Sequence, residues 1–192
     1  MHQVPALTTP EPAKIDHRKL GMWIFLASEV MFFTALIAAA MNMKWRGPAH
    51  ANAALNIPVT AVNTFVLIVS STAVVLALSA LEDGKVKTAR NWMILTAVLG
   101  STFVGIQVNE YIKLIGDGFI PSANTFASGF YAVTSFHGFH VFLGVVTLLW
   151  MLYRLLRGTL TPADPVPFET WGLYWHFVDV VWIVLFTILY LL

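Results

Sequence analysis

Five ionisable side chains with the chemistry to move protons or bind a metal lie inside long apolar stretches of this sequence. They are Glu29, His137, His140, His176 and Asp179. Histidine titrates near neutral pH and ligates metals, and a carboxylate can accept a proton or pair with an imidazole. Because an ionisable group in hydrocarbon is costly, each of these residues is expected to have a function or a polar partner.

Five apolar segments hold these residues, at about 20–43, 57–81, 92–111, 127–153 and 170–192. A helix needs about 20 apolar residues to cross the hydrocarbon core, and each segment is long enough. The chain is 58% apolar and 11% charged, whereas ordinary soluble domains have about 25% charged residues. We therefore predict an all-α membrane protein, with a polar N-terminal tail over 1–19 and one bundle of five transmembrane helices over 20–192.

Basic residues predict the orientation of this bundle, since lysine and arginine concentrate on the inner side of a membrane. With the N-terminus inside and the C-terminus outside, eight basic residues face inward and three outward: Lys14, Arg18, Lys19, Lys85, Lys87, Arg90, Arg154 and Arg157 against Lys44, Arg46 and Lys113. They form no basic stripe, so we expect no nucleic-acid partner. The absence of cysteine excludes c-type haem attachment, iron–sulfur clusters and sites that bind copper or zinc through thiolates.

The five ionisable residues are predicted to share one layer of the membrane. A rise of about 1.5 Å per residue through a core of about 30 Å places all five between about 9 and 15 Å from the inner face. Gln107 and Glu110 are expected near the outer face instead, and we interpret them as interfacial.

Three hypotheses account for the inner layer. In the first, acids and histidines pair with one another and hold the first, fourth and fifth helices together, because His137 and His140, like His176 and Asp179, are spaced to share a helix face. In the second, His137 or His140 binds haem together with His176. In the third, Glu29 belongs to a proton path, although the second and third helices offer few polar residues to continue it.

Other residues indicate how the helices pack. Gly100, Gly105, Gly138 and Gly144 are small enough to let neighbouring helices approach closely. Tryptophans near the ends of segments are typical of membrane-interface anchors, and these are Trp23, Trp45, Trp92 and Trp171.

Four short motifs occur in the order found in one family of membrane proteins. Residues 174–182 read Tyr-Trp-His-Phe-Val-Asp-Val-Val-Trp, and residues 25–33 contain Ser-Glu-Val followed by Phe-Phe. Residues 107–111 read Gln-x-x-Glu-Tyr, and residues 136–141 read Phe-His-Gly-Phe-His-Val. From Lys19 to Leu192 the chain resembles subunit III of the haem–copper respiratory oxidases, in the short five-helix bacterial form.

The resemblance implies a non-redox accessory subunit of a proton-pumping terminal oxidase that reduces oxygen to water, located in the bacterial inner membrane. It implies that haem and copper reside in partner subunits, that this chain holds no metal, and that it has no catalytic residues. The expected partners are oxidase subunits I and II, a small fourth subunit and membrane phospholipid. Such a subunit packs on subunit I and supports proton uptake and the stability of the complex.

Particular residues match positions of the family motifs. Glu29 matches an acid beside the family's phospholipid cleft, and His137, Arg154 and Glu169 match positions associated with lipid or with the helix bundle. Members with seven helices have two further N-terminal helices, which form one wall of that cleft, and this chain starts at the equivalent of the third.

Ser28-Glu29-Val30 favours the cytochrome c branch. The alternatives are a subunit of a quinol oxidase, a homologue associated with nitric oxide reductase, or a separate haem b membrane cytochrome.

Overall fold

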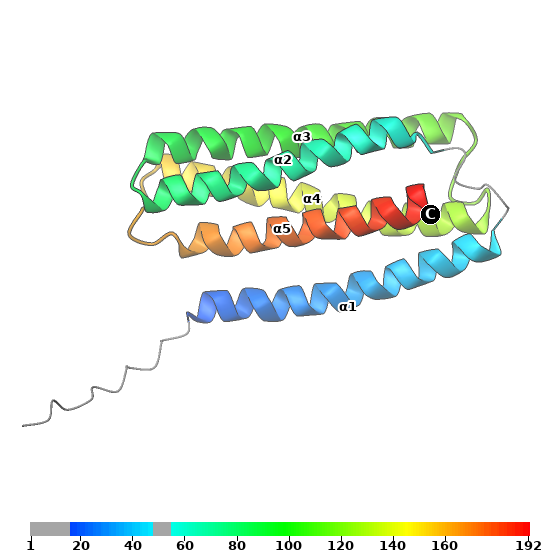
Figure 1. Cartoon of the computed structure of the whole chain (residues 1–192), viewed down its shortest axis with the longest axis horizontal. Coiled ribbons are helices and arrows are strands. Elements are labelled where there is room, and N and C mark those ends of the chain that lie inside the picture. Colours follow the sequence, from blue (N-terminus) through cyan, green and yellow to red (C-terminus); the bar gives the residue numbers. More distant parts are fainter. Residues whose placement is uncertain (1–15, 48–54) are drawn as a thin grey trace, which may run out of the picture.

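A computed structural model describes residues 16–47 and 55–192, which form five long helices (Figure 1). All five are long and apolar enough to cross a membrane, and the described residues contain no strand, which confirms the predicted fold class. A short π-helical turn, η2, follows the last helix. The bounds are α1 His17–Arg46, α2 Ile57–Glu82, α3 Val86–Gly116, α4 Thr125–Leu156, α5 Val166–Phe186 and η2 Thr187–Leu191.

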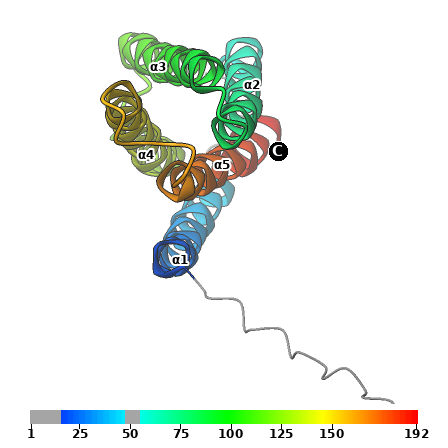
Figure 2. The same ribbon diagram turned by 90° about the vertical axis from the view of Figure 1, so that its left-hand side faces the viewer.

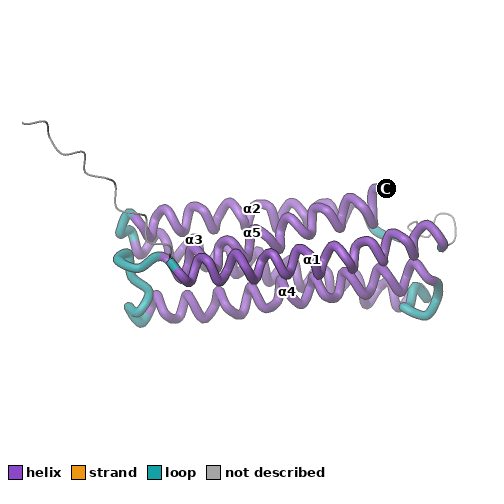
Figure 3. The backbone as a smooth tube through the Cα atoms, turned by 90° about the horizontal axis from the view of Figure 1, so that it is seen from below, coloured by secondary structure: helices purple, strands orange, loops and turns teal. Residues whose placement is uncertain are grey.

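Four of the helices, α2 to α5, surround a common core, and α1 lies outside them against α4 and α5 (Figure 2). All five helices lie along one common long axis (Figure 3), and helices that follow one another in the chain run in opposite directions, so that α1 and α5, which are in contact, run in the same direction. The first residue of α1 and the last residue of the chain therefore lie at opposite ends of the molecule. Below, the end where α1 begins is called the amino end and the other the carboxyl end; which of them faces the cytoplasm remains a prediction.

The helices extend beyond the predicted apolar segments. The α1 helix begins at His17, inside the predicted 1–19 tail, because the Asp16 carboxylate accepts a hydrogen bond from the Arg18 backbone N–H and caps the helix. The rest of that tail, with Lys14, lies outside the described residues. The α3 helix begins six residues before its predicted apolar span. Hydropathy marks the part of a helix that suits hydrocarbon, whereas backbone hydrogen bonds continue the helix into polar sequence.

Tryptophan side chains of α5 fill the core where glycines let neighbouring helices come close. Trp175 is 1% exposed, and its Nε1 donates a hydrogen bond to Ser70 Oγ of α2 at 3.0 Å. A Cβ atom added at Gly144 or at Gly100 would lie 2.7 Å from its ring. The predicted close packing is therefore present at these two glycines. At Gly105 and Gly138, by contrast, no heavy atom would lie within 4 Å of an added Cβ.

The predicted interfacial role of Trp171 is wrong. Its side chain is buried, stacks on Trp175 with ring centroids 5.4 Å apart, and donates its N–H to Gly144 O and Thr147 Oγ1 of α4. The reason is that α5 begins at Val166, so that Trp171 is already in the second turn and faces α4.

Candidate functional site

A carboxylate of α1 meets an imidazole of α4 about midway along the two helices. Glu29 Oε2 lies 3.2 Å from His140 Nε2, and both side chains are largely shielded. The other ring nitrogen of His140, Nδ1, lies 2.7 Å from the Phe136 carbonyl oxygen. A carbonyl can only accept, so Nδ1 carries a proton. A neutral ring then has a bare Nε2 facing the Glu29 carboxylate, and the contact is attractive only if one further proton lies between the two groups.

The amino end of α1 is attached by two ion pairs, one to the first turn of α5 and one to the α4–α5 connection. Lys19 Nζ lies 2.7 Å from Glu169 Oε1, and Arg18 Nη1 lies 2.8 Å from Asp164 Oδ2. The Arg18 guanidinium also contacts Asp16, and its hydrogen bonds hold the pKa values of both the Asp16 and Asp164 carboxyls below their ordinary range. These charges are exposed, so each pair contributes little by itself, but together they fix the end of the helix.

Arg154 lies half-buried in the last turn of α4. Its guanidinium donates to the Thr159 carbonyl at 3.2 Å and lies over the Trp150 ring, 5.1 Å from the ring centroid. The side chain thus closes the end of α4 and keeps its charge at the amino end of the bundle.

His137 makes a different kind of contact from its neighbour His140. It is 1% exposed and stacks on Trp182 of α5, with ring centroids 4.9 Å apart and an interplanar angle of 24°. The edges of Phe33 and Phe103 cover it from two other sides. Neither ring nitrogen has a hydrogen-bond partner among the described residues, so His137 acts there as an aromatic core residue.

His176 and Asp179 do not form the mutual pair that their spacing suggested. His176 Nδ1 lies 3.3 Å from Ser71 Oγ of α2, and Asp179 Oδ1 is buried without a hydrogen-bond partner among the described residues. The α5 face that holds them lies against α2, so a serine of α2 comes within reach of the imidazole. The hypothesis of paired acids and histidines thus describes Glu29 and His140 but not the other three residues.

Gln107 and Glu110 lie near the carboxyl end of α3 with their side chains turned into the bundle, 6% and 8% exposed. Glu110 Oε1 lies 3.4 Å from Lys113 Nζ, one turn closer to the helix end. Nearby, Tyr111 donates a hydrogen bond to Thr134 of α4. Of these contacts, the Tyr111–Thr134 hydrogen bond connects α3 and α4, whereas the Glu110–Lys113 pair lies within α3.

An apolar groove of about 370 Å³ opens between α1, α4 and α5 toward the amino end. Its walls include Met22 and Phe25 of α1, Trp150 of α4 and Tyr174 of α5. Arg154 lies over the Trp150 ring, at one end of the groove. The Tyr174 hydroxyl donates to the His140 carbonyl at 2.9 Å, which puts the Glu29–His140 pair beside the groove.

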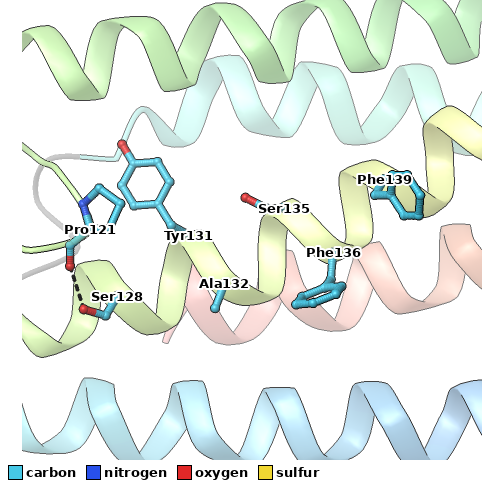
Figure 4. A pocket seen from close by; sticks show the side chains of 7 residues that line it. All are labelled: Pro121, Ser128, Tyr131, Ala132, Ser135, Phe136 and Phe139. Carbon is cyan, nitrogen blue, oxygen red and sulfur yellow. Dashed lines mark hydrogen bonds between the residues drawn. The ribbon is translucent and has the colours of Figure 1, made fainter.

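A second hollow lies along α4 near the carboxyl end (Figure 4). Ser128 Oγ donates to the Pro121 carbonyl at 2.6 Å there, and Phe136 packs on Phe32 of α1 with centroids 5.3 Å apart. None of the predicted site residues lines this hollow.

The described residues contain no group of three or more histidine, cysteine, aspartate or glutamate side chains placed to hold a metal ion. The three histidines of α4 and α5, which are His137, His140 and His176, turn to different partners, namely Trp182, Glu29 and Ser71.

Comparison with known proteins identifies the bundle. The family model described as cytochrome c oxidase subunit III matches residues 11–192. The chain belongs to this family. Cytochrome c oxidase subunit 3 of Thermostichus vulcanus is 38% identical, over 92% of this chain and 88% of the relative. Quinol oxidase subunit 3 of Bacillus subtilis is 35% identical, over 90% and 86%, and the cytochrome bo(3) ubiquinol oxidase subunit 3 of Pseudomonas putida is 33% identical, over 90% and 84%.

The family accounts for the class of protein and its location. Its members are subunits of a terminal oxidase, so this chain is part of an oxidoreductase complex. Five membrane-spanning helices and bacterial relatives identify a multi-pass protein of the bacterial inner membrane.

Ser71 and Tyr174, which contact His176 and His140, were not predicted as part of the site. Serine and tyrosine are too common in membrane helices for their positions to be recognised from the sequence.

Proposed function

We propose that this subunit III is a non-redox accessory subunit of a proton-pumping oxidase that reduces oxygen to water. The observation that carries the proposal is family membership over residues 11–192. The arrangement of polar side chains supports it, because Glu29, His140 and His176 each contact a residue of another helix. Such contacts hold a bundle together and leave haem and copper chemistry to partner subunits I and II. A small fourth subunit is a further expected partner.

We also propose a phospholipid site in the groove between α1, α4 and α5. The groove walls are apolar, as acyl chains require, and Arg154 at the amino end supplies a planar guanidinium suited to a phosphate. Lys19, paired with Glu169 nearby, adds a second cation. The Glu29–His140 pair at the far end would then lie next to the acyl chains, and its proton would be shielded from water. In this position the pair would hold α1 against α4. It would support proton uptake indirectly, by stabilising subunit III within the complex.

Isolation of the native complex tests the proposed function. A tagged copy of this chain, extracted from its own membranes in mild detergent, should copurify with polypeptides that carry haem and copper and that consume oxygen. Phospholipid should remain bound to wild type and be lost in Arg154→Ala. Purification of the chain without any haem-bearing partner would contradict the proposal.

The electron donor of the oxidase is a separate question from the role of this subunit. Relatives of similar identity include both cytochrome c oxidase and quinol oxidase subunits. We propose a cytochrome c oxidase, on the basis of Ser28-Glu29-Val30. Oxygen consumption by the purified complex with reduced cytochrome c, compared with that with a quinol, decides between the two. Faster turnover with the quinol would identify the alternative.

A further inference from the structure

The face formed by α5 and α2 carries a half-buried imidazole far from either end of the helix. His176 lies ten residues after the start of the 26-residue apolar span Val166–Leu191, which is about 15 Å along the helix axis. At this depth the surface of an isolated bundle would be covered by acyl chains. An imidazole in contact with hydrocarbon loses hydrogen bonds that it makes in water, so an uncovered position is unfavourable.

Among the described residues, His176 is the only one that lines both of two hollows beside α5. One, of about 470 Å³, lies between α5 and α1, and the other, of about 330 Å³, lies between α5 and α2. The α2–α5 groove is lined by Ile68, Ser71 and Val75 among others, and Ser71 and His176 are neighbours in it. Grooves beside a ridge of side chains are the surfaces into which a further helix packs.

The hydrogen-bonding capacity of His176 is only half used. Nδ1 lies 3.3 Å from Ser71 Oγ, whereas Nε2 has no hydrogen-bond partner among the described residues. By comparison, both ring nitrogens of His140 face oxygen atoms. The free Nε2 therefore leaves room for a polar partner from beyond the described residues.

We propose that the α2–α5 groove is the docking surface for a transmembrane helix of another oxidase subunit, which presents a hydroxyl, amide or carboxyl side chain to His176 Nε2. The inference rests on the proposed function, since that function supplies the other subunits. Contacts of this kind between membrane helices combine close packing with interhelical hydrogen bonds.

Two other occupants fit the chemistry less well. An acyl chain has no hydrogen-bonding group, and phospholipid headgroups lie at the membrane surface, about 9–15 Å from His176 along the helix axis. A second copy of this chain, docked about a twofold axis, would bring His176 against its own equivalent. A hydrogen bond between the two Nε2 atoms would then require different tautomers in the two copies, with the Ser71 hydroxyl donating to Nδ1 in one copy and accepting from it in the other.

Site-directed photocrosslinking in native membranes tests the proposal. The chain contains no cysteine, so I68C and V75C each introduce one thiol into it, at groove positions whose side chains are 40% and 54% exposed. With a benzophenone maleimide, both variants should give an adduct with the same transmembrane segment of another subunit. L149C, which is 50% exposed and lies on the α3–α4 side, is the matched control and should not label that segment.

A second measurement examines the imidazole itself. His176→Leu should weaken retention of subunit III in the detergent-extracted complex by about 3- to 30-fold, the range for one intramembrane hydrogen bond. His176→Gln, which keeps a donor and an acceptor, should restore most of the retention. Equal retention of wild type and His176→Leu would contradict the hydrogen bond to a partner.

The outcomes separate this inference from the proposed function. Adducts of labelled I68C and V75C with a second copy of this chain, or with lipid alone, would overturn the docking surface even if the oxidase copurifies. Purification of the chain without any oxidase subunit would overturn the proposed function as well.

Discussion

Glycine 144 should be far less tolerant of alanine than glycine 138 on the same helix. A Cβ atom at Gly144 would lie 2.7 Å from Cζ3 and 2.8 Å from Cε3 of Trp175, well inside the 3.5–4.0 Å of a normal carbon contact. The Trp175 ring cannot move away easily, because Gly100 of α3 lies against its other edge and Ser70 accepts its N–H. At Gly138 no heavy atom lies within 4 Å of the added Cβ.

The expected magnitude follows from this geometry. Overpacking by one methyl group costs about 1–3 kcal/mol, and replacing a helical glycine by alanine gains up to about 1 kcal/mol in helix propensity. Gly144→Ala includes both effects, and Gly138→Ala only the second. The difference between their free energies of unfolding should therefore be about 1–3 kcal/mol, with Gly144→Ala the less stable.

Equilibrium unfolding of the purified chain in mixed detergent micelles, followed by circular dichroism, measures this difference. Trp175→Phe removes the ring atoms that the new methyl group would strike, so the cost of Gly144→Ala should fall when the two changes are combined. Equal stability of Gly144→Ala and Gly138→Ala would refute the argument that α4 approaches α5 through Gly144.

The remaining predictions concern contacts of α1. Glu29→Gln should leave oxygen turnover of the assembled complex nearly unchanged, since an amide can donate to His140 without a shared proton, but it should reduce phospholipid retention; immediate loss of turnover would contradict this. Because the pKa of the Asp164 carboxyl is lowered from 3.8 by Arg18, its contribution to stability is present above pH about 4 and is lost as the pH falls through the lowered value. The protection of amide hydrogens at the start of α1, relative to their intrinsic exchange rate, should fall in that acid range, and Asp164→Asn should remove its share of this dependence. Lys44→Met removes contacts to the Ile188 and Leu189 carbonyls at 3.0 and 3.4 Å; it should make η2 more accessible to proteolysis, whereas Arg46→Met should not.

The sequence predicts the fold well because the bilayer restricts the alternatives. Within a bilayer the backbone polar groups must be paired inside the protein, so apolar segments long enough to cross it are expected to be helices. The number of such segments then determines how often the chain crosses the membrane. Helix ends were less predictable, since α3 and α5 continue into polar sequence that hydropathy does not count. Sequence spacing also could not reveal that α1 lies outside the four-helix core, because its apolar residues cover all sides of the helix.

The polar site was predicted in part. Depth along each helix correctly grouped Glu29 with His140, which the structure places 3.2 Å apart. Depth alone does not give the rotation of a residue about its helix axis. The sequence therefore did not predict that His137 faces an aromatic core, or that His176 faces Ser71 instead of Asp179. One residue of helical sequence corresponds to a rotation of about 100°, so residues at the same depth can have entirely different neighbours.

An absorption spectrum is the most direct test of the central claim that this subunit supports the chemistry of its partners. We expect the complex purified through this chain to show haem bands, and the chain separated from its partners to show none. A haem band in the isolated chain that disappears in His176→Ala would contradict the account and identify a haem b membrane cytochrome instead.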